Sequence, residues 1–178
     1  MQSQRTIIVE PYSPLWKDEF MRIKSYLFPY LKDLIIDIVH VGSTSVEGLA
    51  AKPIIDFVII IESYEIFPEL VQRLNTLGYE HEGDGGIGER ECFKRNVKDD
   101  FMQYHMYVCP KDSLELKRQI MFRDYLNMHE DAKCEYAALK ESLAERFRHD
   151  IDSYVDGKHE FIENILKMAQ EEDTNGKL

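Results

Sequence analysis

Hydrophobic residues recur along the chain with two different spacings, which predicts a protein that mixes helices and strands. Two nearly continuous apolar runs, 34–41 and 53–61, have the length and the β-branched content of buried strands. Ahead of the first run, apolar residues at helical spacing predict a helix over 16–31, opened by a Ser-Pro pair. After the second run, a similar stripe over 67–77 predicts another helix, with Ser63 as its cap.

The middle of the chain centres on a glycine-rich segment. Residues 83–88 hold four glycines, which oppose helix and strand alike and predict a flexible loop. We expect a short strand over 79–81 before this loop, and a hairpin over 90–95 and 101–108 after it. The remaining apolar pattern is helical, with helices expected over 113–128, between 132 and 147, and between 161 and 169.

This order of elements predicts an α/β protein of the α+β type. A small mixed sheet, with helices packed mainly on one side of it, precedes a helical C-terminal half. The length of 178 residues fits one compact domain better than two. We therefore expect a single domain over 1–170 and a polar tail over 171–178 that frays.

Composition narrows the class of protein. No apolar run approaches the roughly 20 residues that span a bilayer, so we expect no membrane insertion. The first ten residues lack the basic and apolar regions of a secretory signal. Three cysteines without a Cys-x-x-Cys pair favour reduced thiols over disulfides or a zinc site, which is typical of a cytoplasmic protein.

The charge balance is strongly acidic, with 33 acidic against 22 basic residues and a net charge of −11. Such a surface repels polyphosphate backbones, which disfavours general nucleic-acid binding. A small anionic ligand in a local basic pocket remains open, as does an interaction module whose acidic surface recruits a basic partner. The sequence makes no prediction about oligomeric state.

A Gly-Ser turn follows the first apolar run. Gly42 lets the backbone approach a ligand, and the amides and hydroxyls from Ser43 onward suit phosphate oxygens. An ordinary surface turn is the alternative interpretation. His40, just before the turn, is a further candidate for the site, although a histidine on a buried strand is more often a core residue.

A single acidic residue, Asp56, interrupts the second apolar run. A buried carboxylate is costly unless it binds a cation or accepts good hydrogen bonds. A Gly-Ser turn followed by a strand aspartate is the layout of nucleotidyltransferase folds, in which the turn holds phosphates and the aspartate binds Mg²⁺. We therefore take Asp56 as the candidate catalytic and metal-binding residue. A purely structural aspartate is the alternative.

The chain resembles the GrpB family over nearly its whole length. The stretch 40–56 looks like the signature of that family, and 122–126 agrees with a second block that extends to Tyr154 and Lys158. The resemblance implies a nucleotidyltransferase-like fold, similar to a domain appended to some bacterial dephospho-CoA kinases. It implies binding of a nucleotide or another phosphate-bearing small molecule, with metal-dependent nucleotidyl transfer to an unknown acceptor. The alternative is a non-catalytic domain that binds a nucleotide or CoA precursor.

Two departures from the nucleotidyltransferase pattern favour the non-catalytic alternative. Side chains two positions apart in a strand point the same way, so the usual second acid belongs at Val58. Glu47 and Glu91 are the acids that could take its place. His105 matches the first member of a histidine pair in the family, whose second member is absent here.

Several basic residues match family positions or flank these motifs, and any that converge would neutralise phosphate charge. Arg90 is the strongest candidate, because it follows the glycine-rich loop, while a helical lysine is more often solvated. The other candidates are Lys52, Arg123, Lys140 and Lys158. We interpret the aromatic residues Tyr104, Tyr107, Tyr125, Tyr136 and Tyr154 as packing.

Overall fold

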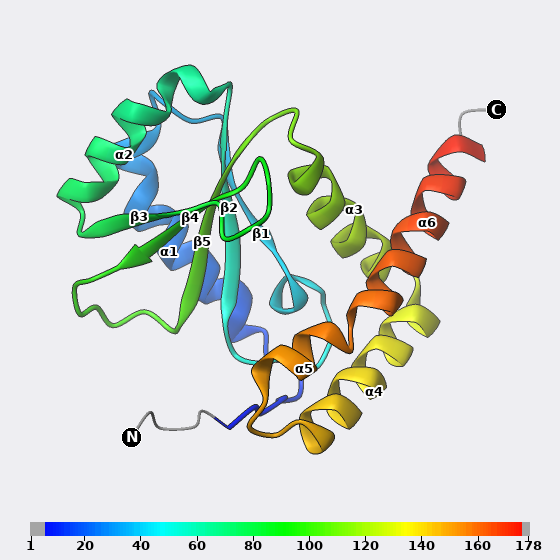
Figure 1. Cartoon of the computed structure of the whole chain (residues 1–178). Helices are drawn as coiled ribbons and strands as arrows, with labels where there is room; N and C mark the ends of the chain where they lie inside the picture. Colours follow the sequence, from blue (N-terminus) through cyan, green and yellow to red (C-terminus); the bar gives the residue numbers. More distant parts are fainter. Residues whose placement is uncertain (1–5, 176–178) are drawn as a thin grey trace.

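The computed structural model describes residues 6–175, which form a five-stranded sheet and six α-helices (Figure 1). The strands are β1 (Asp37–Val41), β2 (Ile55–Ile61), β3 (Tyr79–Gly83), β4 (Glu91–Arg95) and β5 (Tyr104–Pro110). The helices are α1 (Leu15–Leu31), α2 (Phe67–Thr76), α3 (Leu114–Met128), α4 (Glu130–Arg146), α5 (Ile151–Asp156) and α6 (His159–Asn175). Two short 3₁₀ turns are η1 (Ser43–Ser45) and η2 (Tyr64–Ile66).

The sheet is mixed and has the order β1-β2-β5-β4-β3. Strands β2 and β5 run parallel, and the other neighbouring pairs are antiparallel. This confirms the mixed sheet of an α+β fold and both predicted hairpin strands. The first apolar run becomes a strand only at Asp37, since 34–36 form the turn after α1.

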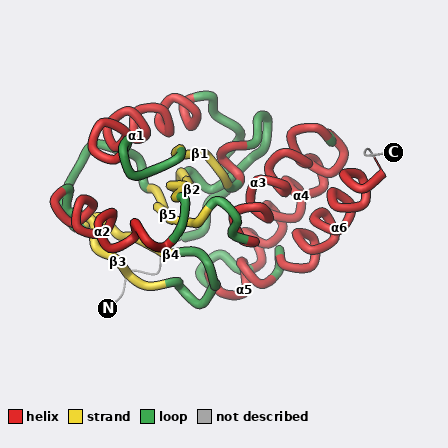
Figure 2. Tube along the Cα trace, turned by 90° about the horizontal axis from the view of Figure 1, so that it is seen from above, coloured by secondary structure: helices red, strands yellow, loops and turns green. Residues whose placement is uncertain are grey.

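Helices cover both faces of the sheet, which corrects the expectation that they lie mainly on one side. Figure 2 shows α1 and α2 along one side of the strands, with α3, α4 and α6 gathered on the other. Helix α6 continues through 171–175, part of the expected tail, and 176–178 lie outside the described residues. No helix among residues 6–175 combines the length and apolar character needed to cross a membrane.

The alternation of side chains along β2 places Asp56 on a defined face. Ile55, Phe57 and Ile59 are fully buried in the core between the sheet and helices α1 and α2. Val58 points the opposite way and packs with Leu116 of α3. Because successive strand residues alternate between faces, Asp56 lies on the side of α3, near the beginning of β2.

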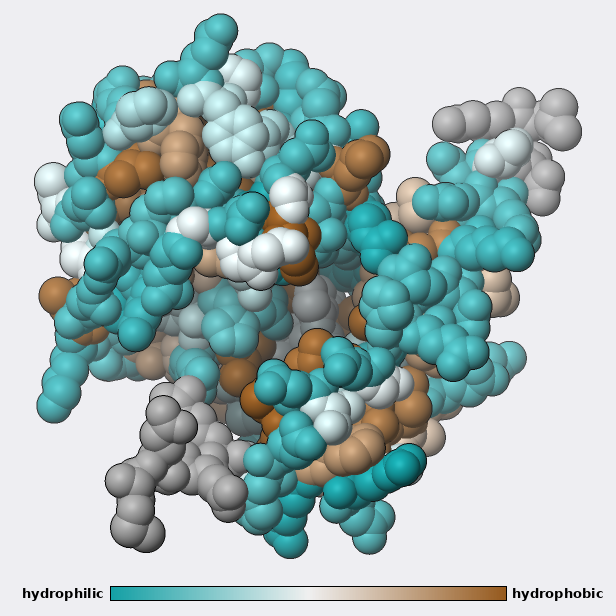
Figure 3. Space-filling model, viewed as in Figure 1, coloured by the Kyte–Doolittle hydropathy of each residue, from teal (hydrophilic) through white to brown (hydrophobic). Residues whose placement is uncertain are grey.

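The loop between η1 and β2 joins the sheet to the helical half. Val46 and Leu49 are buried against Leu126 of α3 and Tyr136 of α4. The surface is hollowed between the strands and the C-terminal helices, over the η1 turn (Figure 3). Residues of both halves therefore meet at the loop that follows the η1 turn.

Candidate functional site

The Gly42 turn passes directly over the Asp56 carboxylate. Val41, at the end of β1, is the register partner of Asp56, so the chain turns at the level of this side chain. Gly42 has a φ of 70°, and a Cβ built there would lie 2.6 Å from Asp56 Oδ2. Only glycine fits this approach without strain.

Hydroxyl groups fix the turn that follows. Ser45 Oγ donates to the Gly42 carbonyl at 2.6 Å, and Thr44 Oγ1 donates to the Ile54 carbonyl at 3.3 Å. Ser43 hydrogen-bonds Tyr136, whose pKa is raised by burial and lowered in part by this bond. The turn is therefore held both by its own side chains and by α4.

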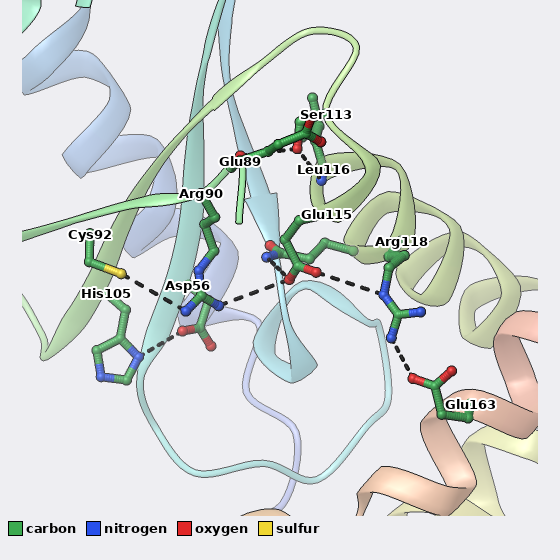
Figure 4. A network of polar contacts seen from close by, with 11 residues as sticks. Asp56, Glu89, Arg90, Cys92, His105, Ser113, Glu115, Leu116, Arg118 and Glu163 are labelled. Carbon is green, nitrogen blue, oxygen red and sulfur yellow. Dashed lines mark hydrogen bonds and ion pairs between the residues drawn. The ribbon is translucent and has the colours of Figure 1, made fainter. Parts of the chain in front are cut away.

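Asp56 forms a close pair with His105. The parallel register of β2 and β5 places the two residues side by side, and His105 Nδ1 lies 2.8 Å from Asp56 Oδ1 (Figure 4). The Asp56 side chain is 26% exposed and the His105 side chain 47% exposed, so solvent reaches the pair. Sequence reasoning treated the two residues separately; the structure brings them into contact.

Three lysines from three separate segments lie close to one another, and two of them, Lys52 and Lys158, interact electrostatically with Asp56. The ammonium groups of Lys52 and Lys158 lie 5.7 Å and 4.6 Å from the centre of the Tyr154 ring. Lys140 Nζ donates to the Ala50 carbonyl and lies 4.7 Å from the centre of the Tyr136 ring. We call Lys52, Lys140 and Lys158 the lysine cluster.

Burial and mutual repulsion disfavour the charged forms of these lysines. Burial, and then Lys158, lower the pKa of Lys140 to about 7. Burial, and then Lys52, lower the pKa of Lys158 to about 8. Burial also lowers the pKa of Lys52, while Asp56 opposes the shift at both Lys52 and Lys158. The lysine cluster thus concentrates positive charge that Asp56 offsets only in part.

Arg90 lies on the same face of the sheet, in a network that leads to α3. Its guanidinium stacks on Tyr107 at 4.5 Å from the ring centre. It also lies 3.9 Å from both Cys92 Sγ and Glu115 Oε1 (Figure 4). Glu89, at a φ of 60°, accepts a hydrogen bond from the first amide of α3. Burial and Asp56 raise the pKa of Tyr107 and Arg90 lowers it, so Tyr107 neighbours both groups.

Glu91 is not part of this arrangement. Its carboxylate lies 2.6 Å from His81 Nε2 and accepts a hydrogen bond from Tyr64 at 3.2 Å. In the β4–β5 register Glu91 pairs with Val108, a member of the core beneath α1 and α2. Glu91 therefore points to the face opposite Asp56 and cannot supply a second carboxylate there.

Three other candidates line a separate cavity of about 410 Å³ beside β1, namely His40, Glu47 and Arg123. His40 stacks on Phe20 with 4.7 Å between ring centres, and burial lowers its pKa to about 4. The Arg123 guanidinium donates to the His40 carbonyl at 2.9 Å. His40 is therefore half-buried, packed on Phe20 at the wall of the cavity.

The donor set at Asp56 does not fit a Mg²⁺ ion held by protein ligands. Mg²⁺ favours several oxygen ligands in octahedral geometry. Across residues 6–175 no three His, Cys, Asp or Glu side chains come together as a metal site, and one Asp56 oxygen already faces His105. The position of the usual second acid, Val58, is fully buried among Val41, Cys109 and Leu116.

Comparison with known proteins identifies relatives along most of the chain. A family model described as "GrpB protein" matches residues 6–168. The UPF0157 protein YqkA of Bacillus subtilis is 34% identical over 94% of this chain, which spans only 48% of YqkA. The glutamate-rich protein GrpB of Alkalihalophilus pseudofirmus is 32% identical, with 90% and 94% coverage of the two chains. A dephospho-CoA kinase of Mycolicibacterium paratuberculosis is 26% identical over 89% of this chain and 45% of its own length.

Solved structures agree with these relatives. The conserved protein GrpB from Enterococcus faecalis matches with a TM-score of 0.81 and 34% identity, over 93% of this chain and 98% of that one. Cid1 in complex with the UTP analogue UMPNPP matches with a TM-score of 0.54 and 17% identity, over 78% of this chain and 43% of Cid1. The second match shows a shared nucleotidyltransferase-like fold. The chain belongs to the GrpB family.

Proposed function

We propose that this protein binds a nucleotide or another phosphate-bearing small molecule at the Gly42–Ser43 turn. The observation that carries the proposal is the lysine cluster. Its ammonium groups come from the loop before β2, from α4 and from the turn before α6. Lys52 and Lys158 meet over the Tyr154 ring within the electrostatic reach of Asp56, and Lys140 neighbours Lys158. Holding like charges together is unfavourable, so the arrangement suits an anion that carries more than one negative charge.

The surroundings of the lysine cluster support this class of ligand. The protein as a whole has a net charge of −11, so a local concentration of positive charge contrasts with the rest of the molecule. Gly42 is partly exposed, and its lack of a side chain lets the turn lie directly against the Asp56 carboxylate. The Tyr154 ring, against which two ammonium groups lie, keeps them close together.

The comparisons narrow the ligands worth testing. Cid1 was solved with a UTP analogue, and one relative is a dephospho-CoA kinase. We therefore propose nucleoside triphosphates and CoA precursors as the first candidates. The three free thiols are consistent with a cytoplasmic location, which we include in the proposal.

Nucleotidyl transfer is the second candidate function. The nucleotidyltransferase-like fold and the polar Asp56–His105 pair beside the turn favour it. The single carboxylate and the buried Val58 favour binding without metal-dependent transfer. Binding is common to both candidates and is tested first.

Isothermal titration with ATP, UTP, dephospho-CoA and inorganic triphosphate tests the binding proposal. Each lost charge-assisted contact is worth about 1.5–3 kcal/mol, so Lys158→Gln and Lys52→Gln should each weaken binding about 10-fold or more. Lys167→Gln, at an exposed position of α6, removes the same charge and serves as the matched control. Equal affinities for all these variants, or no binding of any of the four compounds, would contradict the proposal.

A further inference from the structure

The Asp56–His105 pair has a geometry suited to moving a proton. A carboxylate can only accept hydrogen bonds, so His105 Nδ1 carries the hydrogen that bridges the 2.8 Å to Asp56. This fixes the tautomer, because a neutral imidazole carries one hydrogen and leaves its other nitrogen as a base. Within residues 6–175 His105 Nε2 has no hydrogen-bond partner, and the His105 side chain is 47% exposed.

The same contacts oppose a purely metal-binding role for Asp56. One carboxylate oxygen is engaged by His105, and Oδ2 faces the Gly42 backbone closely enough to exclude even a methyl group. The neighbouring strand position is the fully buried Val58. What the parallel β2 and β5 strands do supply at this level is an imidazole held by a carboxylate.

We propose that His105 is the proton acceptor in a transfer reaction at phosphorus, and that Asp56 is its positioning residue. The inference rests on the proposed phosphate ligand. The oxygen of an acceptor hydroxyl or of water forms a bond to phosphorus, and its proton passes to Nε2. The bond from phosphorus to the leaving oxygen breaks, and the electron pair stays on that oxygen. Asp56 stabilises the imidazolium that forms, as the carboxylate does in other aspartate–histidine pairs.

Asp56 connects this base to the lysine cluster. It contacts His105 directly and acts electrostatically on Lys52 and Lys158. The lysine ammonium groups can therefore offset negative charge on the leaving oxygen, while the exposed edge of His105 meets the acceptor. Charge neutralisation and proton acceptance therefore belong to different side chains, so a separate substitution can remove each one.

The reactivity of Nε2 can be measured without knowing the substrate. At pH 8, diethyl pyrocarbonate acylates neutral imidazole, and peptide mass spectrometry reports the rate at each histidine. We expect His105 to react faster than the exposed His149, to slow to the rate of His149 in Asp56→Asn, and to be protected by inorganic triphosphate. Nitrogen NMR of the wild-type protein should show hydrogen on Nδ1 and none on Nε2. The opposite tautomer, or equal acylation rates in the wild type, would overturn the proposal.

Turnover completes the test and separates it from the binding proposal. Release of phosphate or pyrophosphate from ATP, UTP and dephospho-CoA is measured at high protein concentration, with water and glycerol as acceptors. His105→Gln should lose about 10²-fold or more of this release and keep its ATP affinity within about threefold, whereas Lys158→Gln loses affinity. His149→Gln is the matched control. The absence of any release by the wild type, or full release by His105→Gln, would exclude a base at His105 while leaving the binding proposal intact.

Discussion

Gly42 and Asp56 are in such close contact that a single added methyl group would not fit between them. A Cβ at Gly42 would lie 2.6 Å from Asp56 Oδ2, and the φ of 70° at this position is itself unfavourable for other residues. The turn and the carboxylate therefore constrain each other.

Gly42→Ala should destabilise the protein by about 2 kcal/mol or more, because left-handed backbone costs about 1–2 kcal/mol for a non-glycine residue and the contact adds to it. The free energy of unfolding in urea measures this loss. Gly88→Ala is the matched control, because Gly88 lacks a positive φ and has open space around its Cβ position. Equal stability of the two variants would show that the turn relaxes away from Asp56.

The buried lysines should make stability depend on pH. Lys140 and Lys158 have pKa values of about 7 and 8 in the folded protein, against an ordinary value of 10.5. Between pH 7 and 10 the unfolded chain binds more protons than the folded one, so the contribution of these lysines to stability rises with pH in this window. Below pH 7 both are charged and the cost of burial is fully present.

Urea unfolding at several pH values checks this dependence. Lys140→Met removes one of the two titrating groups and should flatten the rise, while Lys167→Met, on the exposed side of α6, should leave it unchanged. A wild-type curve that is flat between pH 7 and 10, or that falls because of these lysines, would contradict the prediction.

Val58→Asp, which supplies the acid missing from the nucleotidyltransferase pattern, should damage the fold rather than restore a metal site. Val58 is fully buried among apolar side chains, and an unpaired carboxylate there costs several kcal/mol. We expect a lower melting temperature that Mg²⁺ does not recover. Wild-type stability together with a new Mg²⁺-dependent gain in ATP affinity would show that Val58 lies close enough to solvent to serve as a ligand.

Mg²⁺ should add little to ATP affinity in the unmodified protein. The lysine cluster already offers the positive charge, and a Mg²⁺-bound triphosphate carries less negative charge for it to attract. Titrations with and without Mg²⁺ should agree within about threefold, and Asp56→Asn should not change that ratio. A gain of 10-fold or more that disappears in Asp56→Asn would restore Asp56 as a metal ligand.

The sequence predicts the site best where a pattern has one physical meaning. The two apolar runs before and after the Gly42 turn each predict a strand, and the structure confirms both strands. The contact between Asp56 and His105 could not be predicted from the sequence. Strands β2 and β5 are neighbours in the sheet, but β3 and β4 lie between them in the sequence. The face of Glu91 depends on where β4 begins, which the glycine-rich loop obscures.

Aromatic residues show a different limit of sequence reasoning. Tyr136 and Tyr154 are buried, as their interpretation as packing requires, yet they also lie against the ammonium groups of the lysine cluster. The spacing of the tyrosines in the sequence does not predict these contacts with ammonium groups, because most of the contacting lysines come from other segments. Lys140 and Lys158 were found through the family resemblance rather than through any pattern of charge.

The lysine cluster also bears on how the molecule opens. Lys52 belongs to the sheet half, whereas Lys140 and Lys158 belong to the C-terminal helices, and the Lys140 ammonium reaches across to the Ala50 carbonyl. Without an anion, the like charges at this boundary repel one another and offset part of the stabilisation that the Lys140–Ala50 hydrogen bond provides. A bound phosphate would neutralise the lysines of both halves and thereby hold the halves together. Amide hydrogen exchange in α4 and α5 would then slow when phosphate binds.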